Sequence, residues 1–117
     1  MKKIEVISVP VSDQETSKTF YQKLGFQVMV EAPMGNHQTW LQMGFEGTEA
    51  SITLVNWFEN MKAGSMQGLV IKVDDVKTEM EELIAKGITV GKLDDTPYGK
   101  FCTIADPDGN TITLRQE

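Results

Sequence analysis

The sequence predicts an α+β fold in which two βαβββ repeats follow each other along the chain. Two segments have the apolar spacing and end signals of helices, and each is preceded by one strand-like segment and followed by three. The second half also repeats the first, because a shift of 62 residues superposes identical residues at matching positions of the two units. These matches are Val11 with Val73, Asp13 with Asp75, Thr16 with Thr78, Gly25 with Gly87 and Val28 with Val90.

The first repeat begins with residues 3–11, which are rich in β-branched side chains and contain a proline near the end, as expected of a strand. Residues 12–25 then change to a helical period. Ser12 and Glu15 have the spacing of a capping box, and Gly25 stands where a helix ends. The apolar face expected for this helix consists of Thr16, Phe20 and Leu24. The next three strands are expected at residues 26–32, 37–43 and 50–56.

The second repeat follows the same order. Residues 68–73 are predicted as its first strand and residues 74–87 as its helix, which Gly87 ends. The apolar face expected for this helix consists of Val76, Met80, Leu83 and Ile84. The three strands after it are expected at residues 88–92, 98–105 and 110–116, with a solvated loop at residues 92–95.

The chain has the length of one domain, residues 1–117, with repeat units at about 1–57 and 68–117. The connector at about 58–67 has no periodicity, so it either covers the edge of the core or takes part in function. The segment "DPDGN" at residues 106–110 is predicted as a turn. Proline restricts φ, the aspartates can accept bonds from nearby N–H groups, and glycine accepts positive φ.

Composition and charge narrow the functional classes. The chain is 40% apolar and has a formal net charge of −6, which argues against nucleic-acid binding and leaves cationic or neutral small molecules as partners. No apolar run is long enough to span a membrane, and the N-terminus lacks the pattern of a signal peptide. A single cysteine, Cys102, rules out an internal disulfide. We therefore expect a cytoplasmic protein without membrane partners.

The order of these elements resembles the vicinal oxygen chelate family, which includes glyoxalase I, bleomycin-resistance proteins and extradiol dioxygenases. The resemblance depends on the segments "VPVSDQETSKTFYQKLGF" and "FCTIADPDGNTITL" at this spacing, and it covers essentially the whole chain. It implies curved mixed sheets around a central cavity, which two repeats of one chain or repeats of two chains can close. A homodimer is therefore expected.

The enzymes of that family hold a divalent metal through four positions, one on the first and one on the last strand of each unit. The resemblance places these positions at Val6, Thr53, Gly68 and Thr113. None of these residues can replace a histidine or carboxylate ligand. With one histidine in the chain, His37, a two-histidine iron site cannot be assembled either. We expect no metal and no cofactor. His37 is interpreted either as a strand-edge residue or as a hydrogen-bond donor or base in the cavity.

The same strands predict the lining of the cavity, because residues two apart share one face of a strand. The expected set is small, neutral and partly aromatic, which suits an organic molecule held by apolar contact and a few hydrogen bonds. It comprises Val6, Ser8, Trp40, Gln42, Thr53, Gly68, Phe101, Thr103 and Thr113. Cys102 alternates with Phe101 and Thr103 and is therefore expected on the opposite face, in a structural role.

The favoured function is metal-independent binding of a small organic ligand, for sequestration or carriage, without catalysis. One alternative is a glyoxalase-like lyase or isomerase with an atypical site, such as His37 with Glu31 acting as an acid-base pair. A second alternative is a regulatory module whose dimer surface matters more than its pocket. No catalytic residue is assigned from the sequence.

Overall fold

The computed structural model describes all residues from 1 to 117. Its first half contains β1 (Val6–Pro10), α1 (Gln14–Leu24), β2 (Gln27–Gly35), β3 (Gln38–Gly44) and β4 (Ser51–Val55). Its second half contains β5 (Leu69–Lys72), α2 (Val76–Ala85), β6 (Asp94–Thr96), β7 (Gly99–Ala105) and β8 (Thr111–Gln116). The predicted α+β class and the order of the elements are confirmed. No helix has the length and apolar character needed to cross a bilayer.

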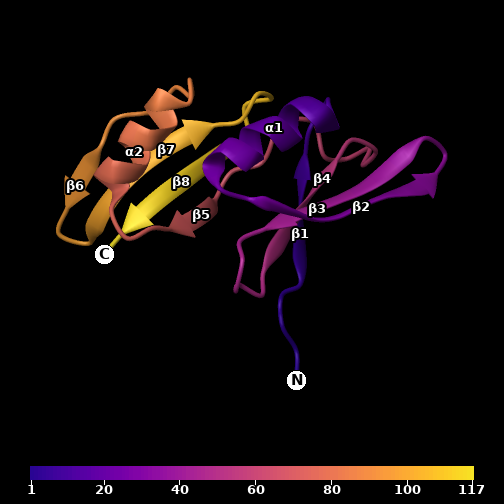
Figure 1. Ribbon diagram of the computed structural model, residues 1–117, viewed down its shortest axis with the longest axis horizontal. Helices are drawn as coiled ribbons and strands as arrows, with labels where there is room; N and C mark the ends of the chain where they lie inside the picture. Colours follow the sequence, from indigo (N-terminus) through magenta and orange to yellow (C-terminus); the bar gives the residue numbers. More distant parts are fainter.

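Each half forms a mixed four-stranded sheet with the same strand order. The first sheet runs β1-β4-β3-β2 and the second β5-β8-β7-β6. In both, the first strand pairs with the last strand in parallel, and the other pairs are antiparallel. The sheets lie side by side with the β2–β3 hairpin extending away from the body, and they do not close into a barrel within one chain (Figure 1).

Both helices begin at an aspartate. The Asp13 carboxylate accepts the backbone N–H groups of Glu15 and Thr16, and Asp75 accepts that of Thr78. Ser12 was expected to cap α1, but its hydroxyl donates to Asp108 Oδ1 at 2.6 Å instead. The helix therefore starts one residue later than predicted, because a carboxylate also interacts favourably with the helix dipole.

One face of each sheet packs against its helix, and a single cluster of 16 buried side chains joins the two halves. On α1 the buried residues are Ser17, Tyr21 and Leu24. The predicted face was therefore partly wrong: Phe20 is half-buried and Thr16 is exposed. On α2, Val76 and Leu83 are buried as predicted, whereas Ile84 is 58% exposed. On α1 the buried face is shifted towards Ser17 and Tyr21, whereas on α2 it is narrower than the apolar pattern.

The region before β7 differs from its prediction. Residues 88–92 form no strand but only one bridge, between Val90 and Ile104. The strand lies instead at β6, in the segment expected to be a solvated loop, where Thr96 pairs with Gly99 across a two-residue turn. Such a turn closes the hairpin at low entropic cost, so the local pairing prevails over the apolar segment.

The "DPDGN" segment forms the predicted turn and also joins the two halves. Asp106 Oδ1 accepts the backbone N–H groups of Asp108 and Asn110, both at 2.9 Å. Its Oδ2 accepts the Tyr21 hydroxyl at 2.9 Å and Asn110 Nδ2 at 2.8 Å. Asn110 Nδ2 also donates to the carbonyl of Pro10 at 2.7 Å. This buried network ties α1 and β1 to the β7–β8 turn.

Candidate functional site

The face of the first sheet opposite α1, here called its open face, carries an ordered chain of hydrogen bonds. Trp40 Nε1 donates to Gln42 Oε1 at 3.1 Å, and Gln42 Nε2 donates to Ser51 Oγ at 2.8 Å. Ser51 Oγ in turn donates to the carbonyl of Glu5 at 2.7 Å. Because an indole N–H can only donate, the orientation of the Gln42 amide follows from its neighbours. The second N–H of the Gln42 amide has no hydrogen-bond partner within the chain.

The same open face holds the predicted residues of β1 and β4. Ser8 pairs with Thr53 in the strand register, and their hydroxyl oxygens lie 3.2 Å apart. Thr53 is fully buried beneath its neighbours, whereas Val6 and Ser8 are half-buried. The structure therefore brings five of the predicted residues together on one sheet: Val6, Ser8, Trp40, Gln42 and Thr53.

The remaining predicted residues belong to the second sheet. Thr103 pairs with Thr113, and Phe101 shares their face by strand alternation. Thr103 is exposed and the other two are half-buried. Gly68 precedes β5 with φ of 93°, and a Cβ there would meet no atom within 4 Å. The face of the second sheet that carries these residues, here called the open face of the second sheet, is therefore partly exposed to solvent.

None of the predicted cavity residues of the first sheet shares a pocket with those of the second. A pocket of about 290 Å³ does lie between the sheets, and it is lined by Ser51 of β4 and Val70 of β5 among others. Apolar side chains near the open edges are also exposed to solvent. Val70 on β5 is 53% exposed, and Val28, Met29, Val30 and Met34 on β2 are exposed as well. A single chain therefore leaves apolar side chains of both sheets exposed to solvent.

The four positions that would hold a metal do not fit one. Val6, Thr53, Gly68 and Thr113 offer neither imidazole nor carboxylate. No group of three or more His, Cys, Asp or Glu side chains is arranged to bind a metal ion. The donor set of this chain is therefore unsuited to a divalent metal.

The other reactive side chains lie outside the open faces. Cys102 is buried against α2, and burial raises the pKa of its thiol, which disfavours a nucleophilic thiolate. His37 lies in the β2–β3 turn with φ of 61°. Glu31 is held by Lys18, whose Nζ lies 3.0 Å from Glu31 Oε2. His37 and Glu31 therefore share no hydrogen bond that would make them an acid-base pair.

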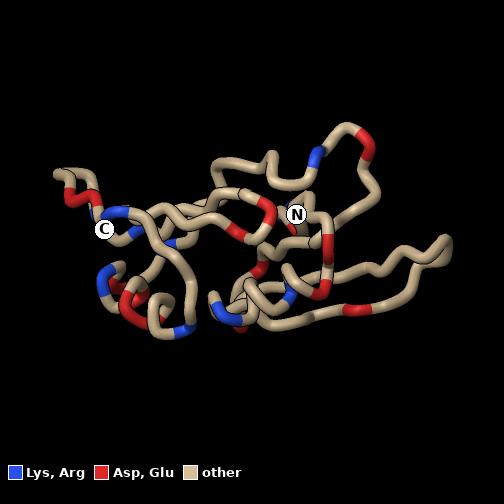
Figure 2. The backbone as a smooth tube through the Cα atoms, turned by 90° about the horizontal axis from the view of Figure 1, so that it is seen from above, with Lys and Arg blue, Asp and Glu red and all other residues tan.

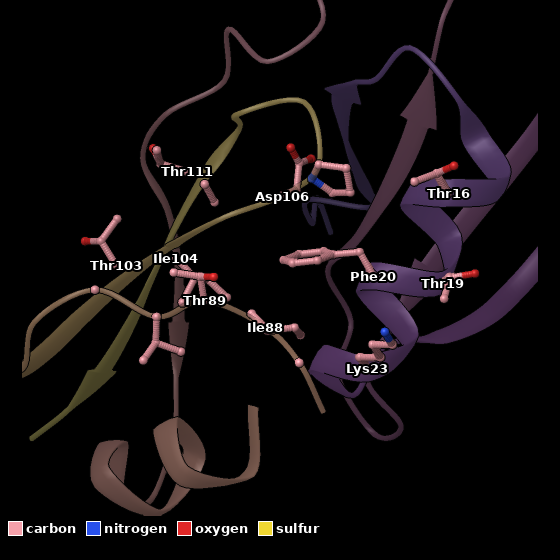
Figure 3. A pocket seen from close by; sticks show the side chains of 15 residues that line it. Thr16, Thr19, Phe20, Lys23, Ile88, Thr89, Thr103, Ile104, Asp106 and Thr111 are labelled. Atoms are coloured by element: carbon pink, nitrogen blue, oxygen red, sulfur yellow. The ribbon is translucent and has the colours of Figure 1, made fainter. Parts of the chain in front are cut away.

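Sequence reasoning missed a groove between the two halves, here called the inter-repeat groove (Figure 3). It has a volume of about 740 Å³. One wall is α1, and the other is formed by the segment before β6 together with β7 and the turn after it. The signal in the sequence was the row Thr16, Thr19, Phe20 and Lys23 on α1, part of which had been placed on the buried face.

The basic residues are not clustered along the backbone. Lys and Arg are mixed with Asp and Glu along the chain, without a continuous basic stripe (Figure 2). With 11 basic and 17 acidic residues, the chain carries a net negative charge, which disfavours binding to a phosphate backbone.

A family model and a curated relative both match this chain over nearly its whole length. The model of the Glyoxalase/Bleomycin resistance protein/Dioxygenase superfamily matches residues 3–114. The protein YetH of Bacillus subtilis (strain 168), described as uncharacterized, is 30% identical over 121 residues, which cover 99% of each chain.

Solved structures share the fold over nearly the whole chain. TnmS3, described as an antibiotic binding protein from Streptomyces sp. CB03234, is 40% identical with a TM-score of 0.93, covering 99% of this chain and 96% of that one. A glyoxalase/bleomycin resistance protein from the same organism is 41% identical with a TM-score of 0.86, covering 97% of this chain and 100% of that one. A superfamily member from Sphaerobacter thermophilus DSM 20745, 24% identical with a TM-score of 0.90, covers 100% of this chain and 98% of that one and supports the fold alone.

Proposed function

The chain belongs to the Glyoxalase/Bleomycin resistance protein/Dioxygenase superfamily, and from this premise we propose that it binds a small organic molecule of the antibiotic type without a metal. The observation that carries the proposal is the Trp40–Gln42–Ser51 hydrogen-bond chain on the open face of the first sheet. It places an aromatic surface beside an oriented amide, which suits a flat organic ligand with a hydrogen-bond acceptor.

The similarity to TnmS3 supports the ligand class. That protein is described as antibiotic binding and shares 40% of its residues with this chain over nearly the full length of both. Binding alone is sufficient for sequestration or carriage, and the metal positions Val6, Thr53, Gly68 and Thr113 supply no ligand for metal-assisted chemistry.

The proposed site is completed by a second copy of the chain. Within one chain the predicted cavity residues of the two sheets share no pocket, and both open faces bear exposed apolar side chains such as Val70 and Met29. In a twofold dimer the open face of the first sheet can lie opposite the second sheet of the partner. The cavity then combines Trp40 and Gln42 with Phe101, Thr103 and Thr113, next to Gly68.

Tryptophan fluorescence tests ligand binding directly. In the variant Trp57→Phe, Trp40 is the only remaining tryptophan, so quenching reports on the proposed face. Titration with metal-free bleomycin and with daunorubicin is expected to give saturable quenching with at least one of them. The added variant Gln42→Ala is expected to weaken that binding about fivefold or more, the usual value of one buried hydrogen bond. Quenching by neither compound, or equal affinity in both variants, would contradict the proposed site.

Metal titration separates binding from enzymatic function. Calorimetry with Zn²⁺, Ni²⁺, Mn²⁺ and Fe²⁺ is expected to show no stoichiometric binding. Micromolar binding of any of them, coupled to lyase or dioxygenase turnover, would favour the alternative, a glyoxalase-like enzyme with an atypical site. Sedimentation equilibrium checks the dimer, and a monomer that still binds ligand at full affinity would refute the shared cavity.

A further inference from the structure

We propose that the inter-repeat groove is a second binding site, specific for a small aromatic carboxylate. Its volume of about 740 Å³ lies in the range typical of ligand sites. Among the residues assigned to the sheet faces, only Thr103 also lines this groove. The inference therefore does not depend on the function proposed for the open faces.

Phe20 provides an aromatic surface in the groove. Its ring extends from α1 towards the segment that carries Ile88 and Thr89 (Figure 3). The ring packs edge-on against Tyr21, with centroids 5.1 Å apart and an interplanar angle of 84°. Tyr21 is itself held by Asp106, so the Phe20 ring has a fixed support. An aromatic ligand can pack on it with little ordering cost.

Positive charge lies one helical turn from this ring. Lys23 follows Phe20 by three residues, which places the two side chains next to each other on α1. The Lys23 ammonium forms no ion pair within the chain. Lys86 Nζ donates to the Lys23 carbonyl at 3.0 Å, which places a second ammonium group at the C-terminal end of α1, outside the lining of the groove. In a chain of net charge −6, this pair is a local attraction for an anion.

The one carboxylate among the lining residues does not oppose an anion strongly. Asp106 is only 5% exposed and accepts the Tyr21 hydroxyl, Asn110 Nδ2 and two backbone N–H groups. These four donors compensate its charge. Lys23 is therefore the charged lining residue of the groove that has no compensating partner within the chain.

Free hydroxyl groups complete the recognition. Thr19 Oγ1 donates to the carbonyl of Glu15 at 3.2 Å, whereas the hydroxyls of Thr16, Thr89 and Thr111 have no partner within the chain. A ligand with an aromatic ring and a carboxylate about one helical turn apart can use all three features. An aliphatic anion would lose the contact with Phe20, and a neutral aromatic compound would lose the attraction to Lys23.

Backbone amide signals in an NMR titration test the proposal with 1-naphthoate as the probe. We expect saturable shifts at residues 16–23 and 87–91. Lys23→Gln is expected to weaken binding about three- to fivefold, the usual value of one exposed ion pair. Lys77→Gln, an exposed lysine of α2 that does not line the groove, is the matched control and should leave the affinity unchanged. The uncharged 1-naphthalenemethanol should bind wild type as weakly as 1-naphthoate binds Lys23→Gln.

Three results would overturn the inference: absence of shifts in the groove, equal affinity of wild type and Lys23→Gln, or shifts confined to the sheet faces. The Trp40 indole signal separates the two sites. If the Trp40 signal shifts while the amide signals of the groove do not, the groove is not the binding site, and the proposed function is unaffected. Phe20→Leu adds a second test, because it should weaken both probes by about fivefold through loss of aromatic packing.

Discussion

The open faces of the two sheets are built at equivalent positions, but their polar side chains are satisfied differently. Thr53 and Thr113 occupy matching places in the two repeats. Thr53 is fully buried and lies 3.2 Å from the Ser8 hydroxyl, whereas Thr113 is half-buried and its hydroxyl has no partner in the chain. The first face is thus preorganised within the chain, and the second is left for a ligand or a partner to satisfy. The two repeats therefore share a topology, whereas their open faces differ in chemistry.

The strongest test of this comparison removes the network that joins the halves. Asp106→Ala leaves the Tyr21 hydroxyl and the Asn110 amide without their buried acceptor, so we expect the free energy of unfolding to fall by about 3 kcal/mol. Urea denaturation followed by circular dichroism measures it. Asp108→Ala, which breaks contacts to the exposed Ser12, is the control and should cost about 1 kcal/mol or less. Equal costs would show that the buried Asp106 network stabilises the fold no more than the exposed contact between Ser12 and Asp108.

The pH dependence of stability tests the same junction. Burial, then the charge of Asp106 and its hydrogen bond, raises the pKa of Tyr21 well above its ordinary value of 10.0. The hydroxyl therefore stays protonated in the folded state, while the unfolded chain releases the proton above about pH 10. The contribution of Tyr21 to the free energy of unfolding is therefore fully present below that pH. Above it, the free energy of unfolding should fall by about 1.4 kcal/mol per pH unit.

The variant Tyr21→Phe isolates this effect. Its stability is expected to decline less steeply than that of wild type between about pH 9 and about pH 11. Lys18, whose pKa is raised by its bonds to Glu31 and Glu15, contributes a decline of the same sign to both proteins. Tyr98→Phe, at an exposed tyrosine, should follow the wild-type curve. Parallel curves for wild type and Tyr21→Phe would show that the Tyr21 proton is not coupled to folding.

A matched pair of substitutions sharpens the comparison of the two faces. Thr53→Val should lower stability by about 1 kcal/mol, because it leaves the Ser8 hydroxyl without its neighbour in a buried site. Thr113→Val should change stability by less than about 0.5 kcal/mol, because no hydrogen bond within the chain is lost. Chemical denaturation of both variants measures the difference. A larger loss of stability for Thr113→Val than for Thr53→Val would contradict the conclusion that the first face is the preorganised one.

The smallest expected difference concerns the helix caps. Asp13 accepts two backbone N–H groups and Asp75 accepts one. Asp13→Ala should therefore cost about 1.5 kcal/mol and Asp75→Ala about 1 kcal/mol. Thermal unfolding of the two variants resolves the order. A larger loss for Asp75→Ala would mean that α2 depends more on its cap than α1, contrary to the hydrogen bonds seen.

Much of the fold follows from local sequence signals. The repeated order of strands and helices and the "DPDGN" turn depend on spacing and backbone preferences of neighbouring residues. The shared face of Ser8 and Thr53, or of Trp40 and Gln42, follows from strand alternation alone. The family, now shown by the match over residues 3–114, rests on the same local features.

Other features depended on contacts between distant parts of the chain. The strand at β6 displaced the one expected at 88–92, because a two-residue turn closed the nearer pairing. Ser12 bonds to Asp108, 96 residues away, and so gives the cap of α1 to Asp13. The inter-repeat groove exists because Tyr21, rather than Phe20, turns into the core to meet Asp106. Sequence periodicity gives the spacing along one element, but which side chain is buried depends on the partner that packs against it, and only the tertiary structure supplies that partner.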